Sequence, residues 1–309
     1  MTIINATGSL PGLGRVMLNN IISSGNSVET KKLFEYLLPE PRRSASRPFA
    51  NLEDTLIAMR DAGLVTESEG SISASQLVEE FAGGAPITSQ RYRRLLQRSI
   101  ATSIADDPWV MAEGDKLTSG TKDLTRALSW FLAQDALSVF TWAGNAKGAL
   151  SVESTQMAQL PGAVSLHPFS NGARWNTFTR WSTATGMSAP ALNGAGLHPD
   201  ATVAIRDVTR ELNPGIHSID DFLGTLTREL PVISGGALHR SFLQYAAEPD
   251  PSAATGLLDT SIAQALLCME EEGLINILDP KADTSSRTIG LGNERRRFTH
   301  VQVNREDAR

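Results

Sequence analysis

Three clusters of arginine are the residues in this chain whose type and spacing could do chemistry. A guanidinium group carries a permanent charge and five donors in a planar fork, so it binds phosphate and carboxylate oxygens in pairs. Arginine outnumbers lysine 22 to 6, although a GC-rich coding sequence would produce the same ratio. The clusters predict nucleic-acid contacts at Arg42, Arg43 and Arg47, at Arg91, Arg94 and Arg98, and at Arg295, Arg296 and Arg297.

The first cluster lies immediately before a helix that we expect to begin at Phe49. Apolar residues of that helix recur at helical spacing and face a core, which leaves Asn51 and Thr55 on the side open to nucleic acid. In a winged-helix protein the chain approaches the DNA backbone at this point. Phosphate binding and a solvated polar turn explain these arginines equally well.

The other two clusters differ in the elements that carry them. The second lies on a predicted helix over 88–102, in a stretch without any acidic residue between Glu80 and Asp106. That helix either holds phosphates or pairs with acidic helices elsewhere in the fold. The third cluster lies on a predicted strand, where alternation sends its first and third arginines to one face and its second to the other.

No pattern in the sequence predicts catalysis. The chain lacks the phosphate-binding loop of nucleotide hydrolases, the paired histidines of zinc proteases and the glycine fingerprint of dinucleotide enzymes. Ser119 and Lys122 match a hydrolase spacing without its companion motifs, and a helix cap explains Ser119. We therefore expect no enzyme activity, no cofactor and no metal site. A nuclease carboxylate cluster, assembled only by the fold, is an alternative that the sequence leaves open.

The single cysteine, Cys268, can form neither an internal disulfide nor a cysteine zinc site. It lies on the apolar face of a predicted helix. We expect it to be a buried core residue and not a reactive thiol.

A repeated phrase indicates the elements that position the arginines. AlaMetArgAspAlaGlyLeuVal at 58–65 is matched by CysMetGluGluGluGlyLeuIle at 268–275, and Gly273 follows Gly63 by 210 residues. In each copy an amphipathic helix ends at a glycine and leads into a β-prone segment. A winged helix passes from its recognition helix into its wing in this order. The phrase therefore predicts one module used twice.

We predict a mainly α fold with small β wings (α+β) in three domains. Residues 1–80 form an N-terminal winged helix, in which a helix is expected from Ser27. Residues 81–214 form a helical central domain, with a degenerate third winged helix as the alternative. All five tryptophans lie there, and we expect core anchors in preference to an aromatic cage. Residues 215–309 form a C-terminal winged helix with an enlarged wing.

The composition is that of a globular protein, with 41% hydrophobic residues in a chain of 309. The net charge of −6 means that any surface for nucleic acid must be a local patch. We find no N-terminal leader and no apolar run of the roughly 18 residues that a membrane span needs. A soluble cytoplasmic protein without a membrane partner is therefore expected.

Acidic residues on the third helix of the C-terminal module oppose DNA binding. Three glutamates end that helix at 270–272, and Asp259 lies near its start. DNA phosphates would repel these carboxylates unless they face away. A protein partner fits this helix as well as DNA does, and the third helix of the first module also carries three carboxylates.

Four segments resemble the DpdG proteins. They are ThrIleIleAsnAlaThrGlySerLeuProGlyLeuGly at 2–14, PheThrArgTrpSerThrAlaThrGlyMetSer at 178–188, GluLeuProValIleSerGlyGlyAla at 229–237 and PheThrHisVal at 298–301. That family is encoded in bacterial clusters that install 7-deazapurine derivatives in DNA and restrict DNA lacking them. The resemblance implies an accessory component that acts among larger enzymes in phage defence. It implies no catalytic residues.

We therefore expect a non-enzymatic component of a DNA modification and restriction system. Its expected partners are double-stranded DNA and other proteins of the defence complex, and self-association is a further option. The alternatives are a protein adaptor with winged-helix domains and a winged-helix transcriptional regulator whose tryptophan-rich middle encloses a ligand pocket.

Overall fold

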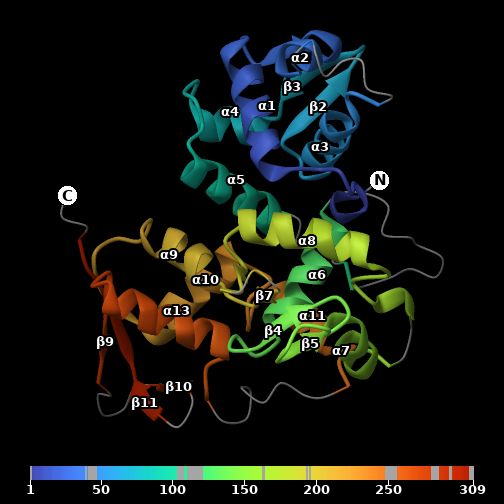
Figure 1. Ribbon diagram of the computed structural model, residues 1–309. Helices are drawn as coiled ribbons and strands as arrows, with labels where there is room; N and C mark the ends of the chain where they lie inside the picture. The colour runs from blue at the N-terminus through green and yellow to red at the C-terminus, as the bar shows by residue number, and fades with distance from the viewer. Residues whose placement is uncertain are drawn as a thin grey trace. The chain divides into compact units, whose positions relative to one another are not determined.

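The computed structural model describes residues 2–38, 40, 47–102, 108–109, 121–161, 164–192, 194, 196–247, 256–279, 285–291 and 294–305. Within them the fold is α+β, mainly helical, with small sheets of two to four strands (Figure 1). The predicted fold class is confirmed at this level. Backbone contacts divide the chain into two compact units, 1–125 with 169–185 and 126–168 with 186–309. The three predicted domain boundaries stay predictions.

In the first unit a three-stranded antiparallel sheet of order β1-β3-β2 is packed with helices. Helix α1 contacts both α3 and β3, and α2 contacts β1. The elements are η1 (Ile3–Asn5), α1 (Pro11–Ser23), β1 (Ser27–Glu29), α2 (Thr30–Leu37), α3 (Ala50–Asp61), β2 (Val65–Ser68), β3 (Ser71–Ala74), α4 (Gln76–Ala82), α5 (Ser89–Thr102), the start of α6 (Lys122–Leu132) and α8 (Gly172–Ala184).

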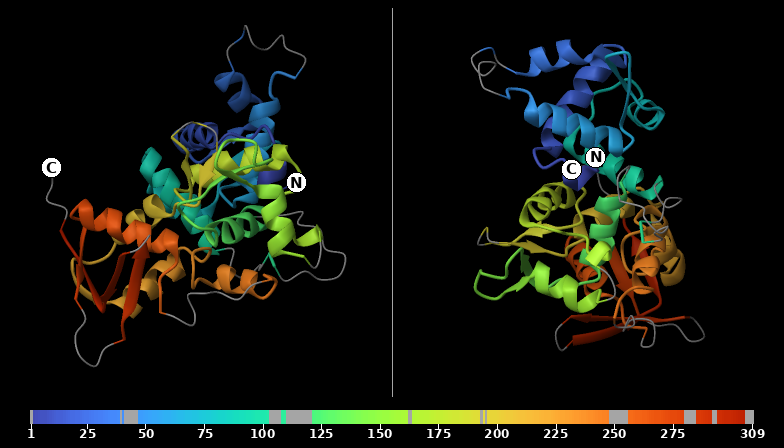
Figure 2. Two further views of the ribbon diagram at one scale, coloured as in Figure 1. Left: turned by 60° about the horizontal axis from the view of Figure 1, so that its bottom comes forward. Right: turned by 90° about the vertical axis from the view of Figure 1, so that its right-hand side faces the viewer.

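The second unit contains sheets of order β5-β4-β7-β6, β8-β12-β9 and β10-β11. Helix α9 packs on α13 and α10, and the β10–β11 hairpin lies at one end of the unit (Figure 2). The elements are β4 (Val139–Thr141), β5 (Ala149–Ser151), α7 (Val152–Gln159), η4 (Val164–Leu166), β6 (Ala189–Pro190), β7 (Leu197–His198), α9 (Thr202–Thr209), β8 (Gly215–Ser218), α10 (Ile219–Glu229), α11 (Ala237–Leu243), α13 (Thr260–Glu271), β9 (Ile275–Leu278), β10 (Arg287–Leu291), β11 (Glu294–Phe298) and β12 (His300–Val303).

The two copies of the repeated phrase form the same turn. Helices α3 and α13 are each followed by a glycine in the left-handed region, with φ of +67° at Gly63 and +73° at Gly273. Glycine adopts this φ without the steric cost that a Cβ brings. In each copy the amide of the next leucine donates to the carbonyl of the methionine before the turn, at 2.9 Å. The helix, glycine and strand order is confirmed in both.

The similarity of the two segments extends beyond this turn. The first unit has the order α1, β1, α2, α3, β2, β3, and the second has α9, β8, α10, α13, β9, β12. In both sheets the last strand lies between the other two. The residue after that strand, Ser75 or Asn304, donates its amide to the leucine of the turn, Leu64 or Leu274. The second copy differs by inserting α11 and the β10–β11 hairpin.

The structure corrects the sequence prediction at its short strands. Ser27–Glu29 form β1, where a helix was predicted to begin, and Gly215–Ser218 form β8, which was not predicted. The middle of the chain contains the sheet β5-β4-β7-β6, which the prediction of a helical middle missed. These strands have two to four residues, so they show no hydrophobic alternation long enough to detect. The partners of β1 and β8, which are β3 and β12, are also distant in the sequence.

The segment 2–10 is built into the first unit against α3. The amide of Gly8 donates to Oδ2 of Asp54 at 2.7 Å, and the amide of Leu10 donates to Oγ1 of Thr55 at 3.1 Å. A side chain at Gly8 would press on Asp54, because a Cβ there would lie 2.7 Å from its Oδ2. Helix α3 is therefore covered here by the chain's own backbone.

Tryptophans anchor the cores, as predicted. The indole N–H of Trp181 on α8 donates to Oγ of Ser9 at 2.9 Å. Phe169, Trp175 and Phe178 form a cluster of rings with centroids 5.0 to 5.5 Å apart. Trp109, Trp130, Trp175 and Trp181 are buried, and Trp142 is half-buried.

Asp123 is a buried carboxyl group in the first turn of α6. Its Oδ2 accepts from the amide of Ile4 at 2.9 Å, Thr2 donates a side-chain hydrogen bond, and Arg174 supplies an opposite charge. Burial outweighs these effects and raises the pKa of Asp123 to about 6. The segment 2–10 is thus attached to a group that titrates within two pH units of neutrality.

We expect Asp123→Asn to remove a pH dependence from stability. The folded state binds this proton more tightly than the unfolded chain, because the pKa is about 6 against an ordinary 3.8. The carboxyl therefore stabilises the fold most below pH 3.8. Its contribution to the free energy of unfolding falls by about 3 kcal/mol as the pH rises to 6. Urea unfolding across this range should show that the free energy of unfolding of the wild type rises, relative to that of the variant, as the pH falls. Glu79→Gln, at an exposed carboxylate, should keep the wild-type profile. Parallel profiles of wild type and Asp123→Asn would contradict the assignment.

Candidate nucleic-acid interface

The β10–β11 hairpin carries the third arginine cluster. Ile289 on β10 is paired with Arg296 on β11. Strand alternation places Arg296 on the same face as the buried Ile289 and Phe298, which we call the inner face. Arg295 and Arg297 lie on the opposite, outer face. The structure therefore separates the three arginines as their alternation predicts.

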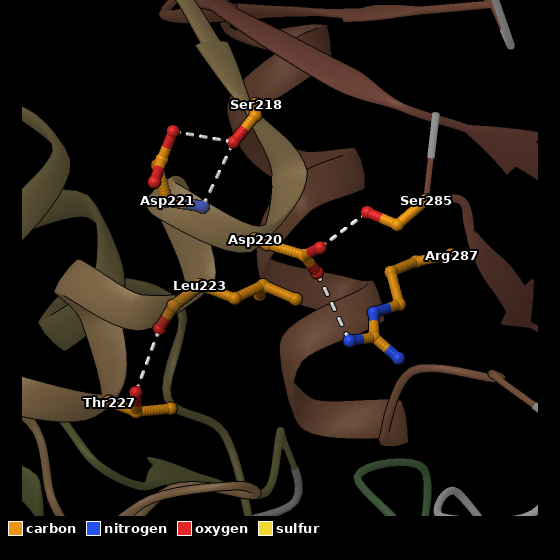
Figure 3. Close-up of polar contacts among 7 residues, drawn as sticks. All are labelled: Ser218, Asp220, Asp221, Leu223, Thr227, Ser285 and Arg287. Carbon is orange, nitrogen blue, oxygen red and sulfur yellow. Dashed lines mark hydrogen bonds and ion pairs between the residues drawn. The ribbon is translucent and has the colours of Figure 1, made fainter. Parts of the chain in front are cut away.

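The arginines on the inner face are engaged by carboxylates. Nη1 of Arg296 lies 3.1 and 2.8 Å from the two carboxylate oxygens of Glu270. Nη2 of Arg287 donates to Asp220 at 3.1 Å, and the hydroxyl of Ser285 donates to the same carboxylate (Figure 3). Ser285 and then Arg287 hold the pKa of Asp220 below its ordinary value. These pairs attach the hairpin to α13 and α10.

The arginines on the outer face have no such partner. Arg295 and Arg297 are both exposed, and Arg297 donates to Oγ of Ser286 at 2.6 Å. Among the residues that the structure describes, neither lies within ion-pair distance of a carboxylate. Two uncompensated guanidinium groups on adjacent positions of one strand face form a local positive patch on an acidic protein.

Two of the three glutamates that end α13 are neutralised by arginines. Glu270 is bound by Arg296, and Glu272 is bound by Arg206 of α9. Glu271 is exposed. The repulsion of phosphate that the sequence predicts at this helix end is therefore reduced by partners that lie far away in the sequence.

The first cluster lies only partly within the described residues. Arg42 and Arg43 fall outside them. Arg47 is exposed, and its Nη2 lies 3.9 Å from Oε2 of Glu53 on α3. An exposed pair at this distance contributes little to stability, so the guanidinium group can leave it for a phosphate.

Of the two α3 residues predicted to contact nucleic acid, one is accessible. Asn51 is exposed. Thr55 is fully buried, and its hydroxyl donates to the carbonyl of Asn51 while it accepts from the amide of Leu10. The prediction for Thr55 was wrong, because the segment 2–10 covers the helix face that the periodicity assigned to solvent.

The arginines of the second cluster mostly contact other residues of the first unit. Arg91 donates to the carbonyl of Phe81 in α4, and the guanidinium carbons of Arg91 and Arg98 lie 5.3 and 5.1 Å from the centre of the Phe81 ring. Arg94 is 4% exposed and donates to Oε1 of Gln97 at 3.3 Å. The prediction for Arg94 was wrong, since its side chain is buried. Arg91 and Arg98 are half-buried, and their contact with nucleic acid stays a prediction.

Cys268, which was predicted to be a buried core residue, is only half-buried. Its side chain is half-exposed on α13, since this part of the helix is not fully covered. Burial, and then the carboxylates of Asp200, Glu271 and Glu272, raise the pKa of its thiol. A raised pKa leaves less thiolate, which is the nucleophilic form.

No three histidine, cysteine, aspartate or glutamate side chains come together as metal ligands in the described part of the chain. None of the helices described has the length and apolar character of a membrane span.

Comparison with known proteins identifies the family. The family model for DpdG-like proteins matches residues 1–284, which include both copies of the repeated turn and end before the β10–β11 hairpin. No similar curated protein and no similar solved structure was found. The family links the chain to the Dpd clusters for 7-deazapurine modification of DNA. The chain belongs to the DpdG-like family.

Proposed function

We propose that this chain is a cytoplasmic, non-enzymatic component of a Dpd modification and restriction system, and that it binds double-stranded DNA through the outer face of the β10–β11 hairpin. The two segments that share the order helix, strand, helix, helix, strand, strand are winged-helix modules. The inserted hairpin is then the enlarged wing of the second module.

One observation carries the DNA-binding proposal. Arg287 and Arg296 on the inner face are each paired with a carboxylate, whereas Arg295 and Arg297 on the outer face project into solvent without one among the described residues. Arginines on a wing grip phosphates or enter a minor groove, and these contacts need no base recognition. The proposal therefore predicts binding with little sequence preference.

Fluorescence anisotropy of a labelled short duplex, titrated with the full chain, tests the proposal. Affinity should fall linearly with salt on logarithmic axes, because each phosphate contact releases condensed counterions. The absence of binding up to high micromolar protein at low salt would overturn it. A duplex with modified purines, used in parallel, reports whether the modification is sensed.

The first module supports a second function, docking of a partner protein. Its third helix, α3, is covered by the segment 2–10, and its exposed cations lie beside carboxylates. The pairs are Lys32 with Glu29 at 3.0 Å, Arg60 with Glu67 at 3.5 Å and Arg47 with Glu53 at 3.9 Å. A surface of balanced charge suits a protein better than it suits DNA. Co-purification of the tagged chain with products of neighbouring genes, after nuclease treatment, tests this function.

A further inference from the structure

A pocket of about 600 Å³ lies in the second unit between α10, α11 and the start of α13. This volume falls within the roughly 300–1,000 Å³ of small-molecule sites. One part of its wall is aliphatic, formed by Leu223, Leu243, Leu257, Leu258 and Ile262. No local sequence pattern predicts this pocket, because these residues come from three separate helices and the turn before α13.

Most polar groups in the wall are already engaged by other protein groups. Asp220 is held between Ser285 and Arg287, and Figure 3 shows this trio beside Leu223. Oδ1 of Asp259 accepts from the amide and the hydroxyl of Ser261, so it caps α13. The charge of Asp220 is thus balanced by Arg287, and the carboxylate of Asp259 is occupied as the N-terminal cap of α13.

Arg240 is the exception. Its side chain is exposed, and Nη1 donates to the carbonyl of Gly235, a neutral partner in the same wall. No carboxylate of the described residues lies within ion-pair distance of it. A fixed guanidinium group beside an aliphatic wall suits a molecule with an apolar body and one negatively charged end.

We propose that this pocket binds a small amphiphilic anion, whose apolar body lies against the leucines and whose carboxylate or phosphate is held by Arg240. The site is distinct from the outer face of the hairpin. Its occupant is a free small molecule, and neither its binding nor its test requires DNA.

Gly224 provides a means to fill the pocket without disturbing the fold. It lines the cavity from the middle of α10, and a Cβ placed there would meet no atom within 4 Å. Methionine also has a higher helix propensity than glycine. Gly224→Met should therefore fold and occupy the apolar part of the site. Gly12→Met, at a helical glycine on α1 that also has open space, is the matched control.

Octanoate and octanol are the probes, because they share an apolar body and differ in charge. Isothermal titration of the full chain should give a Kd at least about tenfold lower for octanoate than for octanol. Arg240→Gln should abolish this difference, whereas Arg228→Gln, at an exposed arginine of α10 outside the pocket, should preserve it. Gly224→Met should weaken both probes at least about tenfold. Equal affinity of the two probes for wild type, no binding of either, or unchanged binding to Gly224→Met would overturn the proposal.

Discussion

Replacing Arg295 and Arg297 by alanine is expected to weaken duplex DNA binding by on the order of tenfold for each arginine. A hydrogen bond to a charged group contributes about 1.5–3 kcal/mol, and both side chains are exposed and lie beside no carboxylate of the described residues. Each lost contact should also reduce the slope of log affinity against log salt by about 0.9. Anisotropy titrations at several salt concentrations measure both quantities.

The matched control is the double variant Lys31→Ala/Lys32→Ala on α2. It changes the net charge by the same amount, but each lysine lies beside a glutamate, at 4.0 Å from Glu35 and 3.0 Å from Glu29. Affinity should change less than about twofold. Equal losses in the two double variants would show that net charge alone governs binding, which contradicts a site on the hairpin.

The repeated turn could be predicted because everything that specifies it is local. Helical spacing of apolar residues, a glycine at the end and a β-prone segment after it all lie within eight residues at 58–65 and 268–275. The left-handed φ of Gly63 and Gly273 follows from these neighbours. Alternation along β11 is equally local, and it placed the outer-face arginines correctly.

Errors arose where a distant segment decides what a residue contacts. The spacing of apolar residues shows which face of α3 packs on the core of its module. The opposite face is then expected to be exposed to solvent. Thr55 lies on that other face, but the backbone of Leu10, 45 residues away, covers it. Arg94 of α5 is buried as well. Pairing of Arg206 with Glu272 was likewise invisible, because 66 residues separate them.

Trp181→Ala is the substitution expected to destabilise the fold most. Trp181 is fully buried on α8, and its indole N–H donates to Oγ of Ser9, which is also buried. Truncation leaves a large cavity and removes that hydrogen bond, so the free energy of unfolding should fall by about 3–5 kcal/mol. Calorimetry should record a Tm lower by roughly 10 °C.

Two companion variants separate the causes of this loss. Trp181→Phe keeps most of the ring but removes the N–H, so it should cost about 1–3 kcal/mol through the unsatisfied hydroxyl of Ser9. Trp142→Ala truncates a half-buried tryptophan in the second unit and should cost less than Trp181→Ala, because less apolar surface is re-exposed. A Trp181→Ala protein as stable as Trp142→Ala would show that the contact between α8 and the segment 2–10 does not hold the first unit together. A clearly larger loss for Trp181→Ala would show that the segments 2–14 and 178–188 stabilise the first unit together, since Ser9 and Trp181 hydrogen-bond each other in its core.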